Sequence, residues 1–170
     1  MVAHRLATPP ALSAVTLVPD IVRCADGGAV VVGSTVFSAW RKPYTPETVQ
    51  FLIDQIDRAA HNPGPLVSFA VFRFSTMRAP GNADVREKTA AALKGYNFHH
   101  TISVMDSSGF ANAMSRLFVA GVLAMIPRRD KVHVVDSVEA GLQESWKLGV
   151  DLSRVRSSLD ALLADTYGTR

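Results

Sequence analysis

The fold of this chain is constrained most by a short strand-like run that leads through a polar turn into a very apolar helix. Residues 101–105 read as a strand, residues 106–109 (Asp-Ser-Ser-Gly) as a turn, and residues 110–126 as a helix. Beyond the first turn of this helix, the only strongly polar side chains are Ser115 and Arg116. A helix that is apolar nearly all round must be buried on more than one side. We therefore expect it inside a layered α/β domain, or against a partner or a lipid.

Strand and helix patterns alternate on both sides of this segment. Asp26-Gly27-Gly28 is a hairpin turn signal, and Gly33 inside the next apolar run indicates a bulge or a close approach. Parallel strands joined by helices need covered sheet faces. We predict an α/β fold with a mixed four- to five-stranded sheet, an opening antiparallel hairpin, helices mainly on one face, and a C-terminal helix. The strand patterns are 14–24, 29–38, 66–75, 99–105 and 131–135, and the helix patterns are 46–61, 83–95, 110–126, a segment after Ser137, and 152–166.

Helix-start signals support these assignments and suggest the domain limits. Thr45 precedes Pro46 in the way an N-cap precedes a first helical proline, and Ser137 is a second N-cap candidate. We predict a leader over 1–13, an α/β domain over 14–148, and a C-terminal helical extension over 149–170.

Composition and charge exclude several classes of protein. The chain has 170 residues, 48% hydrophobic and 19% charged, with a net charge of +3 and no block of Lys and Arg. These values are typical of one globular domain and do not favour nucleic-acid binding. Cys24 is the single cysteine, so an intramolecular disulfide and a cysteine metal site are excluded. The longest apolar run, 117–126, is shorter than the roughly 20 residues of a membrane span, and we expect a cytoplasmic protein.

Three local patterns carry a resemblance to a known fold family. They are the Phe37–Trp40 strand end leading to Pro46-Glu47-Thr48, the strand-to-helix step from Val104 to Arg116, and the strand Lys131–Val135 followed by Ser137–Leu142. With the element order, over about residues 14–146, these patterns resemble the STAS domain, the anti-sigma-factor-antagonist fold. They also resemble the related CRAL-TRIO lipid-transfer fold. The resemblance is to STAS-like bacterial proteins of unassigned role, and it implies a regulatory module without cofactor.

The sequence of the turn at residues 106–109 matches the phosphoserine motif of the antagonist proteins, Asp-Ser-x-Gly. In that family the motif follows the third strand, whereas here it follows the fourth. The segment after the third strand, 75–81, departs from the motif. The resemblance therefore assigns no phosphorylation site to this chain.

Candidate chemical groups are few, and none makes a catalytic set. Residues Ser107, Ser108 and Gly109 could bind an anion at the helix start, or simply cap the helix. The adjacent His99 and His100 point to opposite faces of a strand, so they cannot chelate one metal ion. A serine nucleophile would need a base and an oxyanion hole, and no Gly-x-Ser-x-Gly elbow is present. We expect neither an enzyme nor a metal site.

Arg116 is the strongest single candidate for a functional contact because it lies within an apolar helix. It must reach water, pair with a carboxylate such as Asp106, Asp84 or Glu87, or hold the acid group of a ligand. Trp40, near Arg41 and Lys42, frames a pocket mouth or lies in the core. The candidate contact residues are Arg116, Ser107, Ser108, Gly109 and Trp40.

Two functions follow from these observations. The leading prediction is a non-enzymatic regulatory module that works by protein–protein contact, as a homodimer and with a protein partner. Its contact surfaces would be helix 110–126 and the apolar stripe of Leu152, Val155, Leu159 and Leu162. The alternative is a small carrier or sensor that binds an apolar, lipid-like acidic ligand against helix 110–126. A continuous cavity would favour the alternative, and a fully packed core would favour the first.

Overall fold

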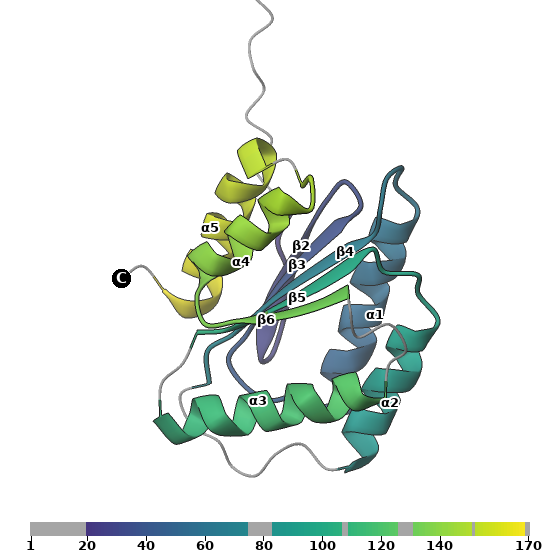
Figure 1. Cartoon of the computed structure of the whole chain (residues 1–170), viewed down its shortest axis with the longest axis vertical. Helices are drawn as coiled ribbons and strands as arrows, with labels where there is room; N and C mark the ends of the chain where they lie inside the picture. The colour runs from purple at the N-terminus through teal and green to yellow at the C-terminus, as the bar shows by residue number, and fades with distance from the viewer. Residues whose placement is uncertain (1–19, 75–82, 107–108, 126–130, 151, 169–170) are drawn as a thin grey trace, which may run out of the picture.

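The structure, a computed structural model, describes residues 20–74, 83–106, 109–125, 131–150 and 152–168 (Figure 1). Its six strands form one sheet in the order β1-β2-β3-β4-β5-β6. The first three strands are antiparallel, and β3 to β6 are parallel. The strands are β1 (Val22–Cys24), β2 (Gly27–Val32), β3 (Thr35–Trp40), β4 (Val67–Phe72), β5 (His100–Met105) and β6 (Val132–Val135). The helices are α1 (Pro46–Ala60), α2 (Ala83–Lys94), α3 (Gly109–Ala124), α4 (Val138–Lys147) and α5 (Leu152–Tyr167).

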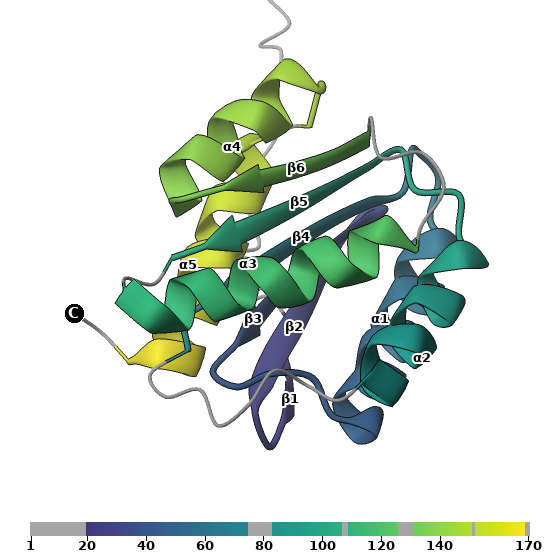
Figure 2. The same cartoon turned by 60° about the horizontal axis from the view of Figure 1, so that its bottom comes forward.

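Helices cover both faces of the sheet. Helices α1, α2 and α3 lie on one face, and α4 and α5 lie on the other (Figures 1 and 2). The expectation that helices lie mainly on one face is therefore wrong. The reason is that β3 and β4 are buried at every position, so their apolar side chains need cover on both sides. Two separate apolar clusters result, one on each face of the sheet.

The sheet has one strand more than the predicted four to five. The apolar run 29–38 is split into β2 and β3, which pair as a hairpin with Val32 opposite Thr35. Gly33 has φ of 57°, so it makes the tight turn between the strands rather than a bulge within one strand. Strand and turn could not be separated by sequence because both strands are largely buried and read as one apolar segment. The antiparallel opening itself and the α/β class are confirmed.

The helix-start signals act as expected. The Thr45 hydroxyl accepts a hydrogen bond from the Thr48 backbone N–H, and the Thr48 hydroxyl accepts one from the Thr45 N–H. This reciprocal capping box begins α1 at Pro46. Ser137 caps α4 by accepting from the Ala140 N–H.

The C-terminal helix α5 packs on the sheet rather than standing apart. Val155, Leu159 and Leu162 of its apolar stripe are buried with Val30 and Phe37 on the sheet. These three positions of the stripe, which was expected as a contact surface, are thus covered within the chain itself. The predicted leader, residues 1–13, lies outside the described residues.

Candidate ligand-binding cavity

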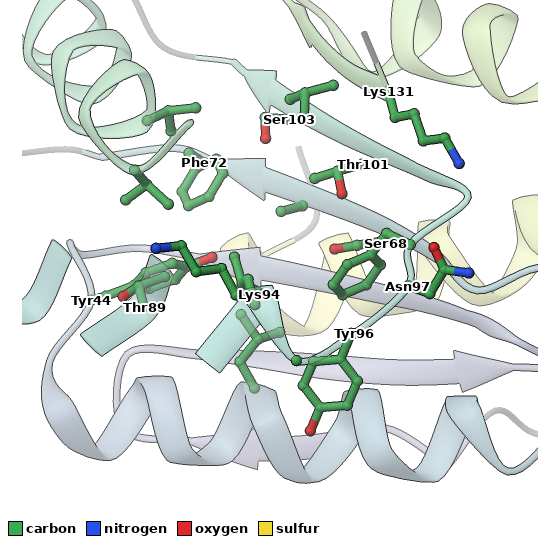
Figure 3. Close-up of a pocket in the computed structure, with 18 residues that line it drawn as sticks. Tyr44, Ser68, Phe72, Thr89, Lys94, Tyr96, Asn97, Thr101, Ser103 and Lys131 are labelled. Atoms are coloured by element: carbon green, nitrogen blue, oxygen red, sulfur yellow. The ribbon is translucent and has the colours of Figure 1, made fainter. Parts of the chain in front are cut away.

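A cavity of about 400 Å³ lies between the sheet and the helices α1, α2 and α3 (Figure 3). Its floor is made by β4 and β5, with the first residue of β6 at one side. Its apolar walls include Leu52 of α1, Leu93 of α2, and Val119 and Val122 of α3. The size is in the range of about 300–1,000 Å³ that small-molecule sites occupy.

The cavity exists because small side chains face one another across the two layers. The positions of β4 and β5 that face the helices are Ser68 and Ala70, and Thr101 and Ser103, before larger side chains follow. Ser68 is the register partner of Thr101, and Ala70 that of Ser103, so the four lie together. Above them α2 packs mainly against α1 and α3 and presents Thr89 to the cavity. Short side chains on both sides leave the space unfilled.

Three hydroxyl groups of the floor face this space. Within the described part of the chain, Ser68, Thr101 and Ser103 make no side-chain hydrogen bond. Figure 3 shows the hydroxyls of Thr101 and Ser103 pointing into the cavity. By contrast, the Ser38 hydroxyl on the neighbouring strand accepts a hydrogen bond from Trp40 Nε1 at 3.0 Å. The floor therefore offers polar groups to an occupant.

The charge of the lining is positive. Lys94 and Lys131 line the cavity, and no Asp or Glu among the described residues does. The three other lysines each pair with a carboxylate, Lys42 with Asp26, Lys88 with Asp84, and Lys147 with Glu144. Lys94 and Lys131 have no carboxylate partner in the described ranges.

Two tyrosines of the lining stay neutral at physiological pH. Burial raises the pKa of Tyr44, whose ring packs edge-on against Trp40 with centroids 4.9 Å apart. Burial, followed by the hydrogen bond to Asp57, raises the pKa of Tyr96 to about 12. The Tyr96 hydroxyl donates that bond over 2.6 Å. Neither tyrosine thus adds negative charge to the cavity.

An outer groove of about 440 Å³ adjoins the cavity. It is lined by more polar surface, and it shares Gly95, Tyr96, Asn97 and Lys131 with the inner cavity. The segment 95–97 and Lys131 thus form the boundary between an apolar interior and a polar exterior. Lys131 contacts both spaces.

The residues singled out by sequence are not brought together at this cavity. Arg116 forms an ion pair with Asp136, a carboxylate that is not among the partners named from the sequence. Trp40 is fully buried in the core, and Gly109 begins α3. Neither Arg116 nor Trp40 lines the cavity. Ser107 and Ser108 lie outside the described residues.

Helix 110–126 lines the cavity through Val119 and Val122. Val119 and Val122 are buried, whereas Leu117 is 62% exposed. The expected burial on more than one side is therefore not met by the side chains that the structure describes on α3.

Ligands of open α/β sheets usually bind at the carboxyl ends of the parallel strands. In this protein, side chains of the chain itself occupy these strand ends. Arg73 and Asp106, which follow β4 and β5, form an ion pair of 2.5 Å. The Tyr167 hydroxyl lies 2.9 Å from the Val71 carbonyl oxygen and 3.0 Å from that of Trp40, and the Arg73 guanidinium stacks over the Tyr167 ring at 4.7 Å. This cluster anchors α5 at the carboxyl ends of the strands.

His100 and His133 lie side by side on the face of the sheet opposite the cavity. His99 is exposed and His100 half-buried, as expected from their adjacent positions in the chain. His133 Nε2 lies 3.3 Å from His100 Nδ1 because β6 pairs beside β5. Glu144 lies 3.9 Å from His133. In the part of the chain that the structure describes, no three His, Cys, Asp or Glu side chains are placed to hold a metal ion.

Comparisons with known proteins add no family. No protein-family model matches the chain, and no curated protein matches its sequence. None of the described helices is both long and apolar enough to cross a membrane.

Proposed function

We propose that this protein is a non-enzymatic carrier or sensor that binds a small, largely apolar molecule in the cavity beneath α3. The observation that carries the proposal is the cavity of about 400 Å³ with apolar walls from three helices. A cavity of this size with mostly apolar walls and a few polar groups is typical of small-molecule sites. Helix 110–126 lines it, in keeping with the second function that the sequence indicates.

A cavity-filling variant tests this proposal. Val122→Phe places a ring in the space from α3, and Ala120→Phe places the same ring on the exposed side of the same helix. We expect the unmodified protein and Ala120→Phe to bind the neutral probe octanamide in calorimetric titrations, and Val122→Phe to lose that binding while keeping its circular dichroism spectrum.

Thr101→Phe fills the cavity from the sheet side, and it replaces Val122→Phe in this test if Val122→Phe does not fold. Equal octanamide binding by the filled and control variants, or no binding by the unmodified protein, contradicts the proposal.

We also propose that the domain is STAS-like. The support is the order of its elements, with opening antiparallel strands followed by repeated helix–strand units. The phosphorylation switch of that family is not part of the proposal.

Contact with a protein partner is the second candidate function, and exposed apolar side chains favour it. Trp146 on α4 is 70% exposed, and Leu117 on α3 is 62% exposed. Large exposed apolar side chains are enriched at contact sites. If they mediate self-association, light scattering shows a dimer that Trp146→Ser or Leu117→Gln converts to a monomer, and a monomer at all concentrations contradicts self-association.

A further inference from the structure

We infer that the ligand of the α1–α3 cavity is an amphipathic organic anion, with its apolar body beneath α3 and its acidic group beside Lys131. This inference rests on the proposed function and adds the chemistry of the ligand's polar end. It is drawn from three features of the cavity: two lysines without a carboxylate partner in the described ranges, the hydroxyl groups of the floor, and the continuity with the outer groove.

The lysines supply the charge. The cavity-lining lysines, Lys94 and Lys131, are the two that lack a carboxylate partner in the described ranges. A cation next to an apolar space is stabilised by an anion, and hydrogen bonds between ionised partners are about twice as strong as neutral ones. A negatively charged ligand group therefore has two cations to approach and no carboxylate in the described lining to repel it.

The hydroxyl groups supply directional contacts. Ser68 and Ser103 are buried, and their hydroxyls, like that of Thr101, make no hydrogen bond within the described part of the chain. Among the described residues, only Thr166 Oγ1 is a fully shielded side-chain oxygen without a partner, so the hydroxyls of Ser68, Thr101 and Ser103 are open to the cavity and can donate to a bound oxygen acceptor. Serine and threonine hydroxyls donate readily to carboxylate or phosphate oxygens.

The position of Lys131 sets the orientation of the ligand. It directly precedes β6, whose first residue, Val132, is the register partner of Thr101. Lys131 also lines both the inner cavity and the outer groove. Figure 3 shows Lys131 at the side of the cavity near Thr101 and Asn97. The acidic group thus lies at the boundary of the cavity and the groove, and the apolar body extends inward to Val119 and Val122.

Titration calorimetry with a matched pair of probes tests the inference. Octanoate and octanamide have the same chain and differ in charge, and octyl phosphate distinguishes a phosphate from a carboxylate headgroup. We expect octanoate or octyl phosphate to bind the full-length protein at least about ten-fold more tightly than octanamide, the scale of one charge-assisted hydrogen bond.

Lysine variants locate the anion. Lys131→Met should weaken binding of the preferred anion about ten-fold and leave octanamide binding unchanged, and Lys94→Met should have a smaller effect in the same direction. Lys147→Met is the matched control, because Lys147 pairs with Glu144 on the other face of the sheet, and it should change neither probe. Thermal unfolding of each variant confirms that it is folded.

The outcomes separate this inference from the proposed function. Equal affinity for the charged and neutral probes, or anion binding unaffected by both Lys131→Met and Lys94→Met, overturns the anionic ligand but leaves an apolar ligand intact. Failure of the unmodified protein to bind any of the three probes overturns both.

Discussion

The same substitution in two helices, Gly141→Ala in α4 and Gly121→Ala in α3, is expected to change stability in opposite directions. A Cβ at Gly141 would lie 2.8 Å from Phe69 Cζ and 2.9 Å from Val104 Cγ2, both in the buried core of the sheet. A Cβ at Gly121 would lie 3.3 Å from the Cδ and one guanidinium nitrogen of Arg86. The first contact is with rigid core atoms, and the second is with a flexible side chain.

The magnitudes follow from two opposing terms. Alanine in place of glycine within a helix stabilises it by about 1 kcal/mol. Overpacking a dense core costs about 1–3 kcal/mol. Gly141→Ala should therefore lower the free energy of unfolding by about 1 kcal/mol, the difference between a mid-range overpacking cost and the helix gain. Gly121→Ala should raise it by about 0.5–1 kcal/mol, since Arg86 can move aside.

Urea unfolding of the two variants beside the unmodified protein measures both effects. The expected result is a separation of about 2 kcal/mol between the variants, with an unchanged dependence on urea concentration. If both variants shift stability by the same sign and amount, then α4 does not press on Phe69 and Val104 as the structure places it.

Two further results are expected from the cavity and its lining. Ser38→Ala should lower the free energy of unfolding by about 1 kcal/mol because it leaves the buried indole N–H of Trp40 without an acceptor. Ser103→Ala should be near neutral because the Ser103 hydroxyl has no partner in the described structure. Denaturant unfolding measures both variants, and equal losses of stability would contradict a Ser103 hydroxyl that is open to the cavity. Tyr96 has a pKa raised from 10.0 to about 12, so its contribution to stability is complete below pH 10 and is lost as pH rises toward 12. Tyr96→Phe should flatten the fall of the melting temperature over that pH range. A pH profile of the melting temperature that is unchanged in the variant would contradict a raised pKa of Tyr96.

Local signals in the sequence predict most of the elements of this fold. Thr45 and Ser137 mark two helix starts correctly because a capping hydroxyl acts within one turn of the chain. The sequence predicts a bulge or a close approach at Gly33, whereas Gly33 makes a turn, because a glycine with positive φ looks the same in these settings. The continuous apolar runs of β3 and β4 indicate that both sheet faces need cover, but not that α4 and α5 return to supply it, because that depends on long-range packing.

The candidate site is harder to predict than the fold. The signal was present, because the alternate positions Ser68 and Ala70, and Thr101 and Ser103, are small or polar in otherwise apolar strands. Recognising a cavity required knowing that the two strands are neighbours and that α2 stands above them. Arg116 is a candidate ligand contact in the sequence because it is a charge in an apolar helix. In the structure it forms an ion pair with Asp136 and does not line the cavity.

Methyl NMR of the protein during titration with octanoate tests the central claim most directly, because it reports where the ligand lies. The account predicts that the methyl signals of Val119, Val122 and Leu52, which line the cavity, shift with the added ligand, while those of Leu159 and Leu162 on the opposite face of the sheet stay in place. Shifts confined to the α4–α5 face, or none at saturating octanoate, would contradict a ligand site beneath α3.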